Sequence, residues 1–350
     1  MRRIVCGQFG PPAGLRMEEV PDPRPGAGEV MIGVRAAGVS FVDGLMIAGS
    51  YQMKARLPFT PGLVSAGKVL GIGPGVSDFA EGSRVVGCSF SLGGYASHRV
   101  LSADEVVPLP AAVTYPVAAT AAESYATILF ALRRRAELRP GEWVLVLGAG
   151  GGIGLAAVDV ASTLGGRVIA AASSQAKRAV AIDAGVQAVV DYETEDLVVR
   201  VREISGEGAD LVIDPVGDRF AEPALHSLRG FGRYLVIGFA GGSIPRLPLD
   251  RVLLDNRTVV GIDWGAWSCL DSAGNRALIA EMLGRVAAGT LHPVIPATYP
   301  LERAAEALVV LGQEPAEHQA DRASSAHNGA VDAERLAALL RITERRGHDR

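Results

Sequence analysis

The sequence predicts an α/β protein whose central element is a doubly wound parallel sheet, preceded by a β-rich segment. From residue 143 onward, short apolar runs alternate with segments of helical periodicity. In the first third of the chain, by contrast, short apolar runs are separated only by glycine- and proline-rich turns. Strands that alternate with crossover helices form a parallel sheet covered by helices, so the second part of the chain is the α/β part.

Each element follows from the periodicity of its segment. The strands of the parallel sheet are expected at residues 143–148, 167–172, 187–191, 209–214, 232–238 and 257–262. The helices between them are expected at residues 152–165, 175–185, 193–205 and 218–230. Before the sheet we expect strands at residues 29–36, 66–72 and 84–88 and a helix at 116–138, and after it helices at 275–288 and 301–311.

Composition excludes several classes of protein. The chain has 350 residues, enough for two domains, with 49% apolar residues and a formal net charge of −4. This balance is typical of a globular protein without general affinity for nucleic acid. There is no apolar run of bilayer length and no signal-peptide core, and the three cysteines lie far apart in the chain. We therefore expect a cytoplasmic protein with reduced thiols.

A glycine cluster follows the first strand of the sheet, in the stretch WVLVLGAGGGIGLAAVDVASTLG at residues 143–165. Glycine lets the backbone turn sharply and lets a diphosphate approach without a side chain between. The first turn of the following helix then offers N–H groups and a positive dipole end to that anion. The order strand, glycine loop, helix, second strand predicts a dinucleotide site rather than a purely structural turn. The residues assigned to it are Gly148, Gly151, Gly152, Ile153 and Gly154.

The end of the second strand indicates which dinucleotide binds. NAD-preferring sites usually place a carboxylate there, whereas this chain has Ser173, followed by Lys177 and Arg178. A carboxylate would repel a 2′-phosphate, while a hydroxyl and an ammonium group would bind it. The sequence therefore predicts NADPH over NADH. The alternative, that Lys177 and Arg178 are a solvated helix start, stays open.

Many segments, in one order, resemble the zinc-independent quinone oxidoreductases of the medium-chain dehydrogenase/reductase superfamily. They include GVSFVDGLMIAGSY (38–51), LPFTPG (57–62), GGYASHRV (93–100), RPGEWVLVLGAGGGIG (139–154), DPVGDRF (214–220) and GRYLVIGFAGG (232–242). The resemblance implies a GroES-like, β-barrel-type catalytic domain at residues 1–125 and 266–312 and a Rossmann NADPH-binding domain at 126–265. The polar tail at 313–350 lacks the final apolar strand of the relatives. A poorly ordered extension is the preferred interpretation of this tail, and an amphipathic helix at residues 333–345 is the alternative.

The resemblance also implies an activity: zinc-free, NADPH-dependent transfer of a hydride to a quinone or an α,β-unsaturated carbonyl compound. Thr127, Ser173, Lys177 and Tyr192 match cofactor-binding positions of the family, and Gly238 and Phe239 stand at a strand end that would line the site. Catalytic candidates are Ser40, where the family often has asparagine, Tyr51, which could hydrogen-bond the acceptor or relay a proton, and Asp43. For Tyr51 a half-buried loop tyrosine, and for Asp43 a helix-start residue, are the structural alternatives.

No metal is expected. The zinc-dependent relatives carry a cysteine where this chain has Ser40, and a Gly-His-Glu where it has Gly62-Leu63-Val64. Tetrahedral zinc needs thiolate, imidazole or carboxylate ligands that converge, and this sequence does not supply them at those positions.

Two alternatives to this activity remain. One is an enoyl-thioester (acyl-CoA) reductase on the same fold. The other, from a different class, is a protein that binds NADPH or RNA without catalysis, although the acidic net charge disfavours RNA. The family also implies a homodimer, in which the expected edge strand at residues 257–262 could pair with its twin.

Overall fold

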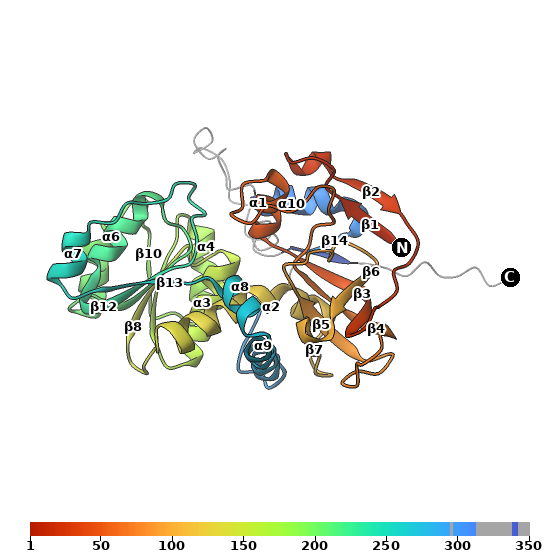
Figure 1. The fold of residues 1–350 in the computed structure, drawn as a ribbon. Helices are drawn as coiled ribbons and strands as arrows, with labels where there is room; N and C mark the ends of the chain where they lie inside the picture. Colours follow the sequence, from red (N-terminus) through yellow and green to blue (C-terminus); the bar gives the residue numbers. More distant parts are fainter. Residues whose placement is uncertain (295–296, 313–337, 342–350) are drawn as a thin grey trace. The chain divides into compact units, whose positions relative to one another are not determined.

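A computed structural model of the protein describes residues 1–294, 297–312 and 338–341. Its contacts divide the chain into two units, which Figure 1 displays in colours that follow the sequence. The mixed-sheet unit contains Met1–Glu123, Asp271–Ala288 and Val294–Arg350. The parallel-sheet unit contains Ser124–Leu270 and Gly289–Pro293.

The parallel-sheet unit is built on a six-stranded sheet in the order β10-β9-β8-β11-β12-β13. Every neighbouring pair in it is parallel, which confirms the doubly wound sheet. Counted from β8, the order is 3-2-1-4-5-6, the arrangement typical of dinucleotide-binding domains. The strands are β8 (Trp143–Leu147), β9 (Arg167–Ala171), β10 (Ala188–Val190), β11 (Ala209–Asp214), β12 (Leu228–Val236) and β13 (Thr258–Gly261).

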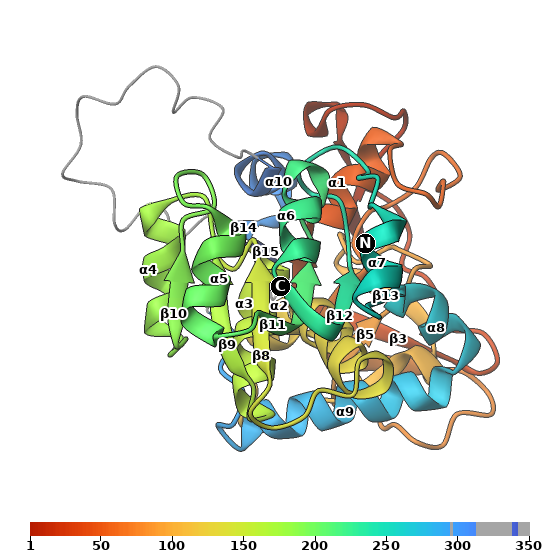
Figure 2. The same cartoon turned by 90° about the vertical axis from the view of Figure 1, so that its left-hand side faces the viewer.

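Helices pack along this sheet, with α5 beside α6 (Figure 2). They are α3 (Gly152–Thr163), α4 (Gln175–Asp183), α5 (Leu197–Ser205), α6 (Ala221–His226), α7 (Leu249–Leu254) and α8 (Trp264–Leu270). The helix expected at 218–230 is shorter than predicted, because Leu228 already belongs to β12, where it is fully buried and pairs with Ala209 of β11. Fully buried apolar side chains such as Leu145, Ile169 and Val212 form the core of the sheet.

The mixed-sheet unit contains a seven-stranded sheet in the order β14-β15-β3-β4-β5-β7, with β6 paired to β3. Its strands are β3 (Glu29–Val39), β4 (Val64–Ile72), β5 (Arg84–Cys88), β6 (His98–Ser102), β7 (Val106–Pro108), β14 (Ala297–Pro300) and β15 (Ala338–Arg341). Two further strands, β1 (Arg2–Val5) and β2 (Arg16–Glu19), pair with each other. Alternate residues of β3, including Val30, Ile32 and Val34, point into a core shared with Tyr95.

Four longer helices accompany these strands. They are α1 (Phe41–Ala48), α2 (Tyr115–Leu129), α9 (Ser272–Ala287) and α10 (Ala304–Gly312). The helix expected at 116–138 is present as α2 followed by a π-helical turn at Phe130–Arg135. No helix in the described ranges combines the length and the apolarity that a bilayer crossing requires.

The C-terminal tail differs from the expectation. Residues 338–341 form strand β15, which pairs antiparallel with β3 and parallel with β14. The expectation that the tail lacks a final strand is therefore wrong. The alternative of an amphipathic helix at 333–345 is wrong for these four positions, and the rest of that segment lies outside the described residues. The segment ALLR is short and mostly apolar, and its backbone groups hydrogen-bond to β3 on one side and β14 on the other. This strand pairing outweighs the helical periodicity of the surrounding sequence.

Candidate functional site

The glycine loop lies between the C-terminal end of β8 and the start of α3. Gly148 has φ of 59°, in the left-handed region that favours glycine. A Cβ atom at Gly154 would lie 2.1 Å from the carbonyl oxygen of Gly148, so the helix can approach the loop only with glycine there. At Gly151, in contrast, a Cβ atom would lie 3.4 Å from that oxygen, an ordinary contact. Gly154 is thus needed for packing, whereas a Cβ atom at Gly151 would make only an ordinary contact.

The N-terminus of α3 suits a phosphate. Gly151 is the N-cap residue, and no side chain in the described part of the chain caps it. Gly152, Ile153 and Gly154 form the first turn, where N–H groups have no partner within the helix. Free N–H groups and the positive end of the helix dipole converge here, so these residues fit the diphosphate of a dinucleotide.

Lys177 lies next to this loop. It is the third residue of α4, and its backbone N–H donates to the capping hydroxyl of Ser174. A Cβ atom on Gly150 would lie 2.4 Å from the Cβ atom of Lys177, so the lysine side chain starts directly over the glycine loop. Arg178 has a different role, because its guanidinium pairs with Asp191 at 2.9 Å and donates to the carbonyl of Ala172.

The other predicted cofactor residues of the parallel-sheet unit follow neighbouring strands. Ser173 comes after β9, Tyr192 after β10, and Gly238 and Phe239 after β12. The carboxyl ends of parallel strands share one edge of a sheet, so these residues line the same edge as the glycine loop. The ring of Tyr192 packs on Phe220 with centroids 4.2 Å apart. Thr127, in contrast, is placed on α2 and is nearly buried, with 9% of its surface exposed.

Sequence reasoning missed the role of Asp214 at the end of β11. Its carboxylate accepts hydrogen bonds from the N–H groups of Val216 and Gly217, at 2.7 and 2.8 Å, and from the hydroxyl of Tyr234. Burial raises the pKa of Asp214, and those hydrogen bonds oppose the rise. Asp214 fixes the loop whose Val216 side chain packs against Gly148, so it supports the glycine loop from behind.

In the mixed-sheet unit, Ser40 and Asp43 form a capping box at the start of α1. The N–H group of Ser40 donates to Asp43 Oδ2 at 2.9 Å, and the Ser40 hydroxyl donates to the same oxygen at 3.1 Å. In return, the N–H group of Asp43 donates to Ser40 Oγ at 3.3 Å. Asp43 is 1% exposed. Asp43 therefore holds Ser40 in place, while the half-buried serine is the more accessible of the two.

Three further polar residues, which sequence reasoning missed, surround this pair. The hydroxyl of Tyr95 donates to Asp43 Oδ2 at 3.0 Å, and the Glu123 carboxyl is hydrogen-bonded to the Ser40 side chain. The buried guanidinium of Arg99 donates to the carbonyls of Leu63 and Ser89 and to the hydroxyl of Ser65. A signal for Glu123 existed, since it is an acidic residue in the apolar helical stretch AATAAESYATIL.

Burial dominates the electrostatics of this group. It raises the pKa of Glu123 to about 8, helped by the nearby charge of Asp43 and opposed by the hydrogen bond to Ser40. Burial also raises the pKa of Asp43, which hydrogen bonds from Ser40 and Tyr95 oppose. Burial lowers the pKa of Arg99 to about 10, although nearby Cys88, Glu105 and Asp43 favour its charged form. The cluster thus holds two carboxyl groups whose pKa values burial raises, the hydroxyl of Ser40 that bonds to both, and the buried guanidinium of Arg99.

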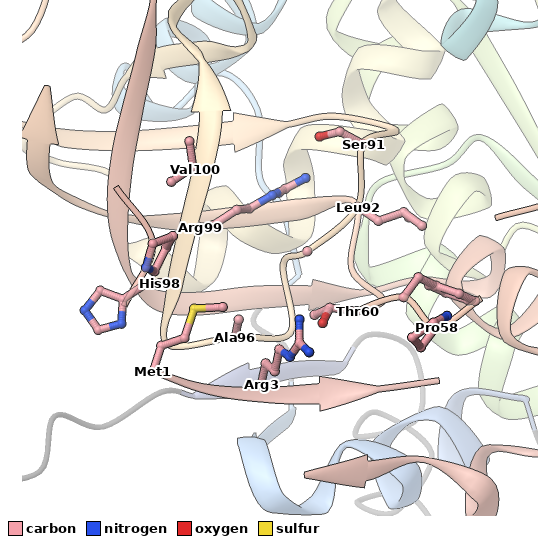
Figure 3. A pocket seen from close by; sticks show the side chains of 13 residues that line it. Met1, Arg3, Pro58, Thr60, Ser91, Leu92, Ala96, His98, Arg99 and Val100 are labelled. Carbon is pink, nitrogen blue, oxygen red and sulfur yellow. The ribbon is translucent and has the colours of Figure 1, made fainter. Parts of the chain in front are cut away.

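Tyr51 follows α1 and is half-buried, with its N–H group bonded to the carbonyl of Leu45 at 3.2 Å. A pocket of about 390 Å³ opens elsewhere in this unit, lined by Arg3, Thr60, His98 and Arg99 among others (Figure 3). Its described lining contains none of the predicted site residues. Arg3 pairs with Glu18 at 3.1 Å, so part of the positive charge around the pocket is already neutralised within the protein.

No zinc ligands are expected from the sequence at Ser40 and at Gly62-Leu63-Val64. The hydroxyl of Ser40 is bonded to Asp43, and Leu63 and Val64 are buried apolar side chains. Within the described ranges, histidine, cysteine, aspartate and glutamate do not gather in any group of three or more able to hold a metal ion.

Comparison with known proteins agrees with both folds. Residues 26–111 match the alcohol dehydrogenase GroES-like domain, and residues 152–279 match the zinc-binding dehydrogenase domain. The quinone oxidoreductase-like protein 2 of Rattus norvegicus is 36% identical over 88% of this chain and 88% of its own length. The quinone oxidoreductase of the same species is 32% identical over 88% of this chain and 92% of its own. The structure of Escherichia coli quinone oxidoreductase complexed with NADPH has a TM-score of 0.84 and 28% identity, covering 97% of this chain and 100% of that one.

A GroES-like domain combined with a Rossmann sheet and a glycine loop before α3 defines an oxidoreductase of the medium-chain dehydrogenase/reductase class. Within that class, the extent and identity of the matches decide the family. The chain belongs to the quinone oxidoreductase family.

Proposed function

We propose that this protein is a zinc-free reductase that uses NADPH to reduce quinones or α,β-unsaturated carbonyl compounds. The observation that carries the proposal is the edge of the parallel sheet, where an uncapped helix N-terminus and Lys177 lie beside one glycine loop. Similar proteins include a quinone oxidoreductase whose structure holds NADPH. When bound, NADPH supplies the hydride, and the protein orients the acceptor and supplies the proton.

The residues of the parallel-sheet unit would hold the coenzyme. Gly148, Gly151, Gly152, Ile153 and Gly154 would bind the diphosphate through backbone N–H groups. Ser173, Lys177 and Tyr192 would surround the 2′-phosphate. The start of the Lys177 side chain over the glycine loop supports this residue as the cation of this subsite. Thr127, Gly238 and Phe239 would hold the nicotinamide end.

The residues of the mixed-sheet unit would act on the acceptor. Ser40 and Tyr51 carry hydroxyl groups able to hydrogen-bond a carbonyl or quinone oxygen, and Asp43 would position Ser40. A quinone or enone delocalises incoming electrons by itself, so its reduction has no need of a metal to polarise the carbonyl. Ser40, Leu63 and Val64 at the zinc-ligand positions support a reaction without zinc.

One experiment tests this function against its alternatives. Purified protein is mixed with NADPH, and the decay of NADPH absorbance is followed with a quinone, an enone and an enoyl-CoA in parallel. We expect the quinone or the enone to be reduced fastest. Preference for the enoyl-CoA would favour the thioester reductase, and tight NADPH binding without oxidation by any acceptor would favour a non-catalytic protein.

We also propose that the protein is a cytoplasmic homodimer. In the described sheet, β13 is an edge strand that pairs only with β12. Val259 of β13 is 39% exposed, and Leu249 and Leu253 of the preceding helix α7 are 75% and 76% exposed. An apolar edge of this kind invites pairing with a second copy. Size-exclusion chromatography with light scattering measures the state of assembly directly.

A further inference from the structure

The pocket of about 390 Å³ in the mixed-sheet unit has no part in the proposed function. Its volume lies within the ~300–1,000 Å³ that is common for ligand-binding pockets. Strand β1 contributes Arg3 to the lining, the loop before β4 contributes Thr60, and β6 contributes His98 and Arg99, as Figure 3 shows. All four residues belong to the segment Met1–Glu123, so the pocket is built within one unit. Their side chains decide what it can bind.

Arg99 is a buried cation that no carboxylate of the described residues pairs with. Its side chain is fixed, because Nη1 donates to the carbonyl of Leu63 at 3.0 Å and to the hydroxyl of Ser65 at 3.1 Å. Nη2 donates to the carbonyl of Ser89 at 3.1 Å, so all three acceptors are neutral. Arg99 is 3% exposed, and buried charges in proteins are usually paired with an opposite charge. An anion from outside the chain would supply that charge.

Three buried polar atoms of the pocket residues have no hydrogen-bond partner in the described part of the chain. They are Nε of Arg3, Oγ1 of Thr60 and Nε of Arg99. An arginine Nε can only donate a hydrogen bond, and a hydroxyl group can donate as well. A buried donor that stays unpaired destabilises a protein, so a ligand rich in acceptor atoms would offset this loss. The set therefore favours an acceptor over a cation or a wholly apolar molecule.

The other charged groups in the described lining of the pocket are already balanced. Glu18 contacts Nη2 of Arg3 at 3.1 Å, and Asp22 contacts the amino group of Met1 at 2.7 Å. The ring of His98 lies 3.7 Å from Asp22, and burial lowers the pKa of His98, so the ring is neutral at neutral pH. The positive charge that remains is the buried guanidinium of β6.

The side chain of Arg3 can adapt to a ligand. It is 35% exposed, and its partner Glu18 is 39% exposed. An ion pair at this exposure contributes little to stability, because water screens it and two long side chains are held in place. The guanidinium of Arg3 can therefore exchange Glu18 for an anion in the pocket, while Arg99 keeps its three hydrogen bonds. Strands β1 and β6 thus present one movable and one fixed guanidinium to the same pocket.

We propose that this pocket binds a small organic oxyanion, whose carboxylate or phosphate group is held by Arg3, Thr60 and Arg99. Guanidinium and hydroxyl groups form charge-assisted hydrogen bonds with the oxygens of either group. The organic part lies against apolar lining residues such as Pro58 and Leu92. The described lining contains none of the residues assigned to NADPH or to the acceptor, so the site stands or falls apart from the proposed function.

Calorimetric titration of the full chain tests the chemistry of the ligand. The probes are benzoate, phenyl phosphate and benzamide, the last having the shape of benzoate without its charge. We expect one of the anions to bind with a Kd of about 1 mM or lower, and benzamide at least roughly tenfold more weakly. The tighter anion identifies the group that the site prefers. Equal affinity for benzoate and benzamide, or no saturation by either anion at about 10 mM, overturns the proposal.

Charge variants locate the binding site. Arg3→Gln should weaken binding of the tighter anion by roughly tenfold, and Thr60→Val by roughly threefold. Glu18→Gln should tighten it by roughly threefold, because Arg3 then loses its competing partner. The matched control is Arg24→Gln, which makes the same charge change at an exposed residue next to the lining residue Pro23, and its Kd should match wild type. Equal effects of Arg3→Gln and Arg24→Gln, or weaker binding by Glu18→Gln, overturn the assignment.

Two further measurements concern the buried cation and the coenzyme. Arg99→Gln should abolish anion binding, and a folded Arg99→Gln protein that binds as wild type does overturns the proposal. If circular dichroism shows this variant unfolded, the Arg3 and Glu18 variants decide. The titration is then repeated with saturating NADPH, which should leave anion binding unchanged. Displacement of the anion by NADPH would place the probe in the coenzyme site and overturn the proposal, whereas a failure of NADPH to reduce any acceptor concerns the proposed function alone.

Discussion

Replacing Gly154 by alanine tests whether close packing of the glycine loop requires this glycine. The new Cβ atom would lie 2.1 Å from the carbonyl oxygen of Gly148 and 2.7 Å from Cα of Ala149. To relieve this clash, the helix and the loop must move apart by about 1 Å. A rotamer change cannot relieve it, because the clashing atoms belong to the backbone. Overpacking of this kind costs about 1–3 kcal/mol. A contact of 2.1 Å with backbone belongs at the upper end of that range, about 2–3 kcal/mol. The helix propensity of alanine returns up to about 1 kcal/mol, so we expect a net loss of about 1–2 kcal/mol.

The assay is thermal unfolding without coenzyme, followed by circular dichroism. For a chain of this size each kcal/mol lowers Tm by roughly 2–4 °C, so Gly154→Ala should unfold about 2–8 °C earlier than wild type. It should also bind NADPH more weakly in a fluorescence titration, because the displaced loop turns its N–H groups away. The matched control is Gly151→Ala, where the Cβ atom meets only Gly148 O at 3.4 Å and φ is −91°. Gly151→Ala should keep the wild-type Tm within a few degrees and lose NADPH affinity alone.

Two results would refute this reasoning. If Gly154→Ala unfolds at the wild-type temperature, the loop is soft enough to absorb the methyl group and the steric account is wrong. If Gly151→Ala binds NADPH as wild type does, the diphosphate does not approach on that side of the loop.

Three further predictions concern the coenzyme, the acceptor and the assembly. Lys177→Glu should weaken NADPH binding by at least tenfold and NADH binding far less, because a charge-assisted bond contributes about 1.5–3 kcal/mol. The dissociation constants of the two coenzymes measure this, and an unchanged preference for NADPH would contradict the assignment. Tyr51→Phe should reduce kcat/KM by about tenfold through the loss of one hydrogen bond to the acceptor, and full turnover with every quinone and enone would rule that contact out. Val259→Glu on β13 should yield monomers in light scattering, because two copies would bring like charges together at the paired edge; a dimer of wild-type strength would show that assembly uses another surface.

The parallel sheet could be read from the sequence because its strands are fully buried. Val144–Leu147 and Leu211–Ile213 are continuous apolar runs bounded by glycine or polar residues, and local pattern is then enough. The sequence also predicts where the cofactor-binding residues lie, since residues that directly follow parallel strands share one edge of the sheet. This is why Ser173, Tyr192 and Gly238 lie on the glycine-loop edge without any long-range information.

The remaining features depend on contacts that local pattern does not contain. From the sequence, a helix start is only the alternative role of Asp43, although Ser40 and Asp43 have the spacing of a capping box. The burial of Glu123 beside Ser40 joins α2 to the start of α1, and no periodicity reports such a contact. Likewise, β15 is a strand only because β3 and β14 offer free backbone groups on either side of it.

The position of β15 has a consequence for the order in which the chain can fold. Strand β3 pairs with β6 along Glu29–Gly33 and with β15 along Ala36–Val39, yet β15 is the last described strand to leave the ribosome. During synthesis the second half of β3 therefore waits with unpaired backbone groups while the whole middle of the chain emerges. An edge of this kind can pair with another chain, so one side of β3 stays available for wrong association until the final segment arrives.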